Sequence, residues 1–140
     1  MSRVIIIDAS VVAKWLLDDE KSLQADKIKE EFLNNSVTIQ APTVIYYEIN
    51  NLLKSSAISQ RISSLKAVKV YQDFLDLDFT TYSSKELLAD TLNKALELNI
   101  SSYDASYIAL AEYLKVSLYT ADEKLVKKAK SPLVKNLSDY

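Results

Sequence analysis

The stretch VIIIDAS, residues 4–10, decides the fold of this chain. Four apolar β-branched residues, Val4 to Ile7, lead directly into Asp8. A short continuous apolar run of this kind predicts a strand that is buried on both faces of a sheet. The carboxylate that follows has no basic residue beside it in the sequence. Because open α/β sheets bind ligands outside the carboxyl ends of their strands, Asp8 stands where a functional site is expected.

The rest of the chain alternates between predicted strands and predicted helices. We expect strands at 3–8, 37–40, 78–81, 117–120 and 134–137, and helices at 10–17, 21–34, 43–55, 59–75, 84–98, 102–114 and 122–130. In the helix at 84–98, the residues expected to face inward are Leu87, Leu88, Leu92 and Leu96. Strands separated by helices predict an α/β fold with a parallel sheet covered on both faces. No linker or repeat interrupts residues 1–140, so we expect a single domain.

The composition excludes several classes of site. The chain has no Cys, no His and no Gly. It can therefore form no disulfide, zinc–thiolate site, Ser-His-Asp triad or glycine-rich phosphate loop. The carboxylates that remain favour hard cations such as Mg²⁺ or Mn²⁺. There is no apolar run long enough to span a membrane and no signal-peptide pattern, so we expect a cytoplasmic protein.

Three further acids border apolar segments. Asp122 ends the motif TAD, which follows the apolar VSLY of a predicted strand. Glu48 lies in TVIYYEINNLL and Asp104 in SSYDASYIALAEYL, each near the start of a largely apolar predicted helix. Taken singly, the aspartates are explained as helix caps or first-turn acids, and Glu48 as an exposed helix residue.

Taken together, four acids near one edge of a sheet predict a metal site. Two carboxylates about 5 Å apart repel each other by roughly 3 kcal/mol at an effective dielectric of about 20, so four of them either take up protons or bind a cation. A divalent cation polarises a phosphoryl oxygen and lowers the pKa of a bound water. Metal-bound hydroxide is the expected nucleophile, because the chain has no His to act as a base. Ser10, Asn51 and Thr120 are candidates for hydrogen bonds to the metal ligands, with cap or turn roles as the alternative.

These motifs resemble, in order, those of the PIN-domain family, and in particular the VapC-type toxins of toxin–antitoxin pairs. The segment VIIIDASVVAKWLL resembles the first strand with its leading aspartate, Asp8. APTVIYYEINNLL resembles the second acidic motif, with Glu48 and Asn51. ISSYDASYIALAEYLKVSLYTADEKLVKKA resembles the third and fourth motifs, with Asp104 and Asp122. The resemblance covers nearly the whole chain, although family members often have Gly where Lys115 stands.

The resemblance implies a three-layer α/β/α sandwich with a central parallel sheet. It implies a Mg²⁺- or Mn²⁺-dependent endoribonuclease whose catalytic and metal-binding residues are Asp8, Glu48, Asp104 and Asp122. It also implies a homodimer and a small VapB-type antitoxin that blocks the site. Ser10 and Thr120 match positions that often assist the metal site in this family.

Two segments are basic although the formal net charge is −2. Residues 50–70 contain four bases and no acid, and residues 124–138 contain five lysines and no acid. Such runs are usually solvated helix faces, but they also suit contacts with an RNA backbone. Within them the candidates for RNA binding are Lys54, Arg61, Lys66 and Lys127.

Other classes of function place an acid after a first strand. A haloacid-dehalogenase phosphatase would need a second Asp where Ser10 stands, and a receiver domain would need paired acids before its first helix. A non-catalytic PIN-like module that binds metal or RNA would carry the same acids as the enzyme. Metal-dependent RNA cleavage that is lost in Asp8→Asn would distinguish the enzyme from such a module.

Overall fold

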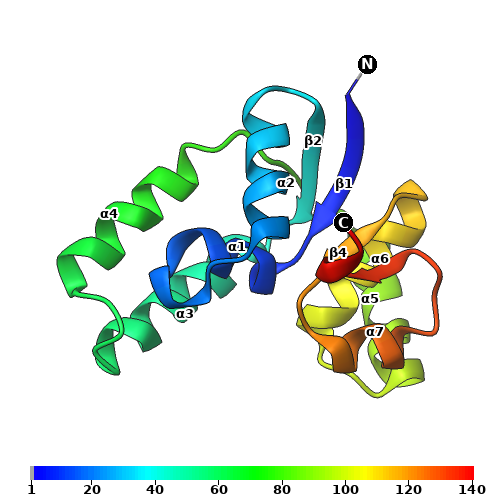
Figure 1. Ribbon diagram of the computed structural model, residues 1–140. Coiled ribbons are helices and arrows are strands. Elements are labelled where there is room, and N and C mark those ends of the chain that lie inside the picture. The colour runs from blue at the N-terminus through cyan, green and yellow to red at the C-terminus, as the bar shows by residue number, and fades with distance from the viewer. Residues whose placement is uncertain (1) are drawn as a thin grey trace.

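The computed structural model describes residues 2–140 and contains a five-stranded, fully parallel sheet in the order β3-β2-β1-β4-β5 (Figure 1). The strands are β1 (Arg3–Ile7), β2 (Val37–Pro42), β3 (Thr80–Tyr82), β4 (Leu118–Thr120) and β5 (Val134–Asn136). The α-helices are α1 (Ala9–Leu16), α2 (Leu23–Leu33), α3 (Ile45–Ile58), α4 (Ser64–Leu75), α5 (Lys85–Leu98), α6 (Ser102–Leu114) and α7 (Glu123–Ala129). Two short 3-10 helices, η1 (Asp18–Glu20) and η2 (Leu137–Asp139), follow α1 and β5.

Strand β1 lies at the centre of the sheet, as its continuous apolar run predicts. Ile6 pairs with Gln40 of β2 on one side and with Leu118 of β4 on the other. The apolar residues Ile5 and Ile7 flank it and are equally buried. The connection from β3 to β4 passes over β2 and β1, so the strand order reverses between β1 and β4. Ligand sites of open parallel sheets lie at such a reversal.

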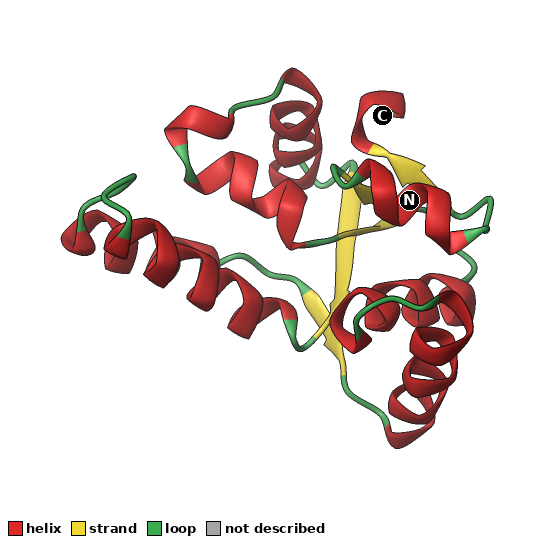
Figure 2. Cartoon of the chain, turned by 90° about the horizontal axis from the view of Figure 1, so that it is seen from below, coloured by secondary structure: helices red, strands yellow, loops and turns green. Residues whose placement is uncertain are grey.

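Helices cover both faces of the sheet, which confirms the expected three-layer α/β/α sandwich. Helices α1 to α4 lie on one side and α5 to α7 on the other, as right-handed crossovers between parallel strands require (Figure 1). Figure 2 shows helices on both sides of the strands. The α3–α4 hairpin projects from its side of the molecule (Figure 1). Its outer helix is anchored by Phe74, which packs edge-on against Phe79 with ring centroids 5.7 Å apart. Within residues 2–140, no helix combines the length and the apolar character needed to cross a bilayer.

The helix boundaries differ from the predicted ones most clearly between α3 and α4. The helix predicted at 43–55 continues to Ile58, and the one predicted at 59–75 begins only at Ser64. Gln60 adopts a left-handed conformation with φ of 65° and ends the first helix. Ser63 then caps α4 by accepting a hydrogen bond of 3.1 Å from the Lys66 N–H. The turn was hard to predict because neither Gly nor Pro marks it.

The inward face predicted for α5 is wrong for three of its four leucines. Leu88, Leu92 and Leu96 are 59%, 56% and 74% exposed. The buried positions of this helix are Thr91 and Ala95 instead. Helix α5 packs chiefly against α6 rather than on the sheet, and small side chains let two helices approach closely. The leucines therefore form a stripe on the outer surface of the molecule.

Turns that usually need Gly are made here by other residues. The left-handed residues are Asn35, Gln60, Asn99, Lys115 and Lys130. Asn99, Lys115 and Lys130 are the C-terminal caps of α5, α6 and α7, positions that Gly commonly fills. Lys115, with φ of 57°, thus forms the turn that ends α6 without a Gly. A residue with a β-carbon loses roughly 1–2 kcal/mol of stability in the left-handed conformation. Asn adopts this conformation more readily than Lys.

Candidate active site

Asp8 lies at the carboxyl end of β1 and caps the start of α1. It is 5% exposed. Its Oδ1 accepts hydrogen bonds from the Ser10 N–H at 3.1 Å and the Ser10 hydroxyl at 2.5 Å, and its Oδ2 accepts one from the Thr120 hydroxyl at 2.5 Å. Burial raises the pKa of Asp8 to about 6, and the hydrogen bonds oppose this rise. The carboxylate is thus held in a fixed orientation, but it is costly to ionise without a nearby cation.

The hydroxyls of Ser10 and Thr120 are oriented by the loop that follows β4. The Ala121 N–H donates to Ser10 Oγ at 2.9 Å, and the Asp122 N–H donates to Thr120 Oγ1 at 3.1 Å. Each hydroxyl oxygen therefore accepts from the backbone, and each hydroxyl proton is directed to Asp8. The start of α1 and the end of β4 are joined through this one carboxylate.

Glu48 lies in the first turn of α3 and is held by Tyr107 of α6. The buried Tyr107 hydroxyl donates a hydrogen bond of 2.6 Å to Glu48 Oε1. Burial raises the pKa of Glu48, the Tyr107 hydrogen bond opposes this, and the charges of Asp8 and Asp104 raise it further. Burial, together with the charge of Glu48, also raises the pKa of the Tyr107 hydroxyl, which therefore remains a donor.

Tyr107 contacts the candidate site, and the sequence did not predict it there. The available signal was its position three residues after Asp104, which puts both side chains on one face of the same helix. Tyrosines are common in apolar segments of this chain, which has nine of them. The sequence therefore gave no reason to separate this one from packing residues.

Asp104 and Asp122 lie at the starts of α6 and α7. Ser101 caps α6 by accepting a hydrogen bond of 3.0 Å from the Asp104 N–H. Burial raises the pKa of Asp104, and the charge of Asp122 raises it further. Asp122 Oδ1 accepts hydrogen bonds from the N–H groups of Lys124 at 3.0 Å and Leu125 at 3.3 Å. Asp104 and Asp122 both line a cavity of about 260 Å³.

The four acids form a connected group of mutually repelling charges, in which Asp8 also interacts with Asp104. Glu48 is affected by Asp8 and Asp104, and Asp104 in turn by Asp122. Among residues 2–140, no Lys or Arg side chain lies within 4.0 Å of any of these carboxylates. In the same part of the chain, no three Asp or Glu side chains are already grouped as ligands of one metal ion. The structure thus brings the four predicted acids close enough for their charges to interact, but not into a closed cage of metal ligands.

Asn51 and the basic candidates Lys54 and Lys127 lie outside this group of acids. Asn51 is exposed on α3, one turn after Glu48, and both line a hollow of about 540 Å³ that Tyr103 also borders. Lys54 lies further along α3, and Lys127 is exposed on α7. The RNA-binding candidates Lys54 and Lys127 therefore lie on two different helices, α3 and α7.

Arg61 and Lys66 are already paired with acids. Arg61 lies 3.0 Å from Asp19 and 2.8 Å from Glu20 of η1. The Lys66 ammonium lies 2.7 Å from Asp18 of the same short helix. The basic segment at 50–70 is therefore partly neutralised by an acidic turn that lies far from it in the sequence.

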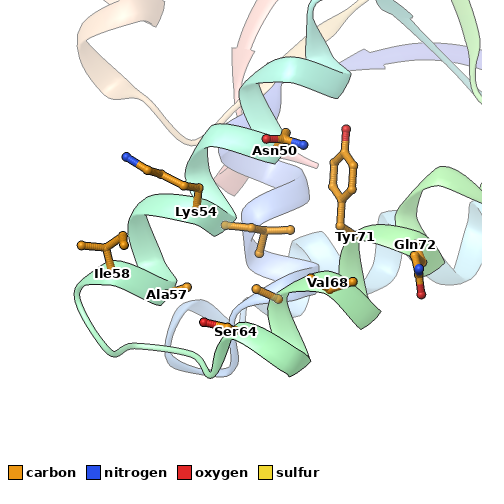
Figure 3. A pocket seen from close by; sticks show the side chains of 10 residues that line it. Asn50, Lys54, Ala57, Ile58, Ser64, Val68, Tyr71 and Gln72 are labelled. Atoms are coloured by element: carbon orange, nitrogen blue, oxygen red, sulfur yellow. The ribbon is translucent and has the colours of Figure 1, made fainter.

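An apolar groove of about 440 Å³ separates α3 from α4 (Figure 3). Its floor includes the buried residues Leu53 and Ala67. Its edges include Ile58 and Val68, which are 74% and 58% exposed, and Lys54. The groove is thus an apolar surface with a positive charge at its edge.

Comparison with known proteins identifies relatives over almost the whole chain. A model of the PIN domain family matches residues 5–131. Ribonuclease VapC3 of Pyrobaculum aerophilum is 26% identical over 126 residues, which cover 89% of this chain and 93% of that protein. Ribonuclease VapC9 of Mycobacterium tuberculosis is 30% identical over 122 residues, which cover 87% and 88%.

Two solved structures share the fold. PAE2754 from Pyrobaculum aerophilum matches with a TM-score of 0.72 at 24% identity, covering 99% of this chain and 94% of that one. VapBC-1 from nontypeable Haemophilus influenzae matches with a TM-score of 0.66 at 12% identity, covering 96% and 98%. The order of strands and helices described above is therefore that of a known architecture.

Proposed function

Because this chain belongs to the PIN domain family, we propose that it is an endoribonuclease and the toxin of a VapBC-type toxin–antitoxin pair. The observation that carries this proposal is the buried carboxylate of Asp8, fixed by two hydroxyls where β1 and β4 end and placed beside three acids without basic partners. The relatives named ribonuclease VapC support the same activity. A non-catalytic module is not favoured, because a buried acid with a raised pKa destabilises the fold and is typical of a functional site.

The donor set fits a divalent cation such as Mg²⁺ or Mn²⁺. Asp8, Glu48, Asp104 and Asp122 offer only carboxylate oxygens, and a cation would offset the burial and the mutual repulsion that raise the pKa of the first three. When bound, such an ion supplies a water of lowered pKa and polarises the scissile phosphodiester. We propose these four acids as both the metal ligands and the catalytic residues.

Other side chains position the proposed catalytic acids. Ser10 and Thr120 orient the two oxygens of Asp8 and favour its charged form. Tyr107 does the same for one oxygen of Glu48. Asn51 borders the hollow beside Glu48 and can donate its amide N–H to a substrate there.

The proposed substrate is RNA, whose phosphates require basic partners. Lys54 and Lys127 are exposed and belong to no ion pair among residues 2–140, so both are available to bind phosphate. Arg61 and Lys66 stay candidates, but a phosphate would have to replace the acids of η1 as their partners. We therefore expect Lys54 and Lys127 to contribute more to the salt dependence of binding.

A VapB-type antitoxin is the proposed protein partner, as in the VapBC-1 complex that shares the fold. The groove between α3 and α4 is the surface proposed for it (Figure 3). Its exposed edge residues Ile58 and Val68 would be covered by an apolar segment, and Lys54 would pair with an acidic residue of that segment. Occupation of this groove would place the antitoxin on the same helix as Glu48.

A homodimer is the proposed oligomeric state. The stripe of Leu88, Leu92 and Leu96 on α5 repeats every four residues and lies on the surface. A second copy of α5, presented by a two-fold related chain, would bury this stripe against itself. The proposed catalytic acids do not lie on this helix, so the contact leaves them accessible.

The first experiment is cleavage of a mixed RNA pool with Mg²⁺, Mn²⁺ or EDTA by the wild type and Asp8→Asn. We expect cleavage that requires both the metal and Asp8. Asp26→Asn, which alters an exposed acid of α2, is the matched control and should cleave like the wild type. Cleavage in EDTA would contradict the metal requirement, and wild-type cleavage by Asp8→Asn would remove this residue from the site.

A further inference from the structure

Helix α7 contributes two lysines to a cavity that two of the proposed catalytic acids also line. Lys124 and Lys128 are one helical turn apart, and both line the cavity of about 260 Å³ that is also lined by Asp104 and Asp122. Lys127, which the sequence analysis chose from this segment, does not line that cavity. The tertiary structure thus selects a different pair from among the lysines of the basic segment.

Both lysines have charge available for an anion. Neither forms an ion pair among the described residues, although two carboxylates border the same cavity. The Lys128 ammonium donates a hydrogen bond of 3.4 Å to the carbonyl oxygen of Asn99. Asn99 is the left-handed residue that ends α5, and it also lines the cavity. This contact directs Lys128 toward the α5–α6 connection that borders Asp104.

A bound metal ion and the two lysines would all carry positive charge, so an anion between them would stabilise the loaded site. A divalent cation held by Asp104 and Asp122 would be repelled by the ammonium groups of α7, because like charges destabilise each other at short range. A phosphate between them would interact favourably with both. An RNA strand offers such an anion at every nucleotide, so the phosphate next to the scissile one can fill this place.

We propose that Lys124 and Lys128 bind the nonbridging oxygens of the RNA phosphate adjacent to the scissile one and so set the position of the strand on Asp104 and Asp122. The inference rests on the proposed ribonuclease function and deepens it. Both residues are substrate-binding groups in this scheme, and the chemistry of bond cleavage stays with the acids.

The test compares the full chain with the double variant K124A/K128A and with Lys85→Ala as the matched control. Lys85 is an exposed lysine at the opposite end of α5 from Asn99, about 20 Å away along the helix. The probe is a fluorescently labelled, randomised single-stranded RNA. Its binding is measured by anisotropy in EDTA over a series of salt concentrations, and its cleavage is measured with Mg²⁺ or Mn²⁺.

We expect the double variant to raise KM roughly tenfold with little change in kcat. The slope of log K against log salt should fall by about 0.7, the value for one phosphate contact on a single strand. K124R/K128R should restore both quantities, since Arg also binds phosphate, and Lys85→Ala should behave like the wild type.

Two results would overturn the inference. The first is a salt slope and KM of the double variant equal to those of Lys85→Ala while the wild type binds and cleaves. The second is a loss of kcat that K124R/K128R fails to restore, which would indicate a structural role for α7. A wild type that neither binds nor cleaves any RNA would overturn the proposed function itself, and this inference with it.

Discussion

The hydroxyl of Thr120 donates a hydrogen bond of 2.5 Å to the carboxylate of Asp8, 112 positions away in the sequence. This bond joins the ends of two neighbouring parallel strands at the reversal of the strand order. Thr120 is fully buried, and its hydroxyl also accepts from the Asp122 N–H. The Thr120 hydroxyl therefore contacts both the side chain of Asp8 and the backbone of Asp122.

Replacing Thr120 should change the pH dependence of activity. Thr120→Val keeps the shape of the side chain and removes a hydrogen bond to a charged group, which is worth about 1.5–3 kcal/mol. The pKa of Asp8 should rise above its value of about 6. The acid limb of the pH–rate profile should then move to higher pH by about one unit. Thr120→Ser keeps the hydroxyl, so its profile should match that of the wild type; equal profiles for all three proteins would contradict this role.

The stability of the metal-free protein should fall as the pH rises through about 6. The pKa of Asp8 is about 6 in the folded protein and 3.8 in the reference state, so the folded protein binds the proton more tightly. The stabilisation is fully present below about pH 4 and is lost as the pH rises through about 6, a change of about 3 kcal/mol. The raised pKa values of Glu48 and Asp104 act in the same direction.

Urea denaturation in EDTA, on both sides of this pH window, measures the effect. Asp8→Asn should be at least as stable as the wild type above pH 6, because its amide carries no charge and its oxygen still accepts from Ser10. Asp26→Asn should follow the wild type. A wild type whose stability did not change across the window would contradict the assignment of a buried, destabilising carboxylate.

Tyr107→Phe should reduce cleavage without unfolding the protein. The substitution removes the hydrogen bond to Glu48 and leaves the ring in place, so Glu48 loses its fixed orientation and its pKa rises further. We expect activity to fall roughly tenfold. Tyr113→Phe is the matched control on the same helix, because Tyr113 is 64% exposed and does not border the hollow beside Glu48. Equal activity of the two variants would show that Tyr107 serves packing alone.

Lys115→Gly should stabilise the protein. Lys115 has φ of 57° at the end of α6, where Gly has no β-carbon to strain. We expect a gain of about 1 kcal/mol in the free energy of unfolding, measured by urea denaturation. Lys115→Ala keeps a β-carbon and should give no such gain. A gain in Lys115→Ala as large as that in Lys115→Gly would assign the effect to the lost charge instead.

The two exposed apolar surfaces should respond to different substitutions. Leu92→Glu, in the stripe of α5, should give a monomer in light scattering and still bind the antitoxin. Val68→Glu, at the edge of the α3–α4 groove, should keep the dimer and lose the antitoxin in a pull-down with the purified partner. Each variant is the control for the other, and a Leu92→Glu protein that stayed dimeric would exclude the stripe as the contact.

The sequence alone predicted the class of fold and the four acids of the candidate site. The apolar run before Asp8 predicted the central strand, and TAD predicted a second acid at the end of a neighbouring strand. These predictions succeed because the period and length of an apolar run are local properties that decide between strand and helix. The placement of acids after parallel strands then follows from the rule that such strands end at one edge of the sheet.

Only the tertiary structure decided how the helices and side chains meet. The outward stripe of α5 depends on which face α6 covers, and the contact of Tyr107 with Glu48 joins residues 59 positions apart. The choice of Lys124 and Lys128 over Lys127 depends on the rotation of α7 about its own axis. Helix periodicity shows which residues share a face of a helix. The neighbour that packs against that face depends on contacts between distant segments. The sequence by itself therefore determined the helices and strands, and the tertiary structure determined which side chains surround the acids.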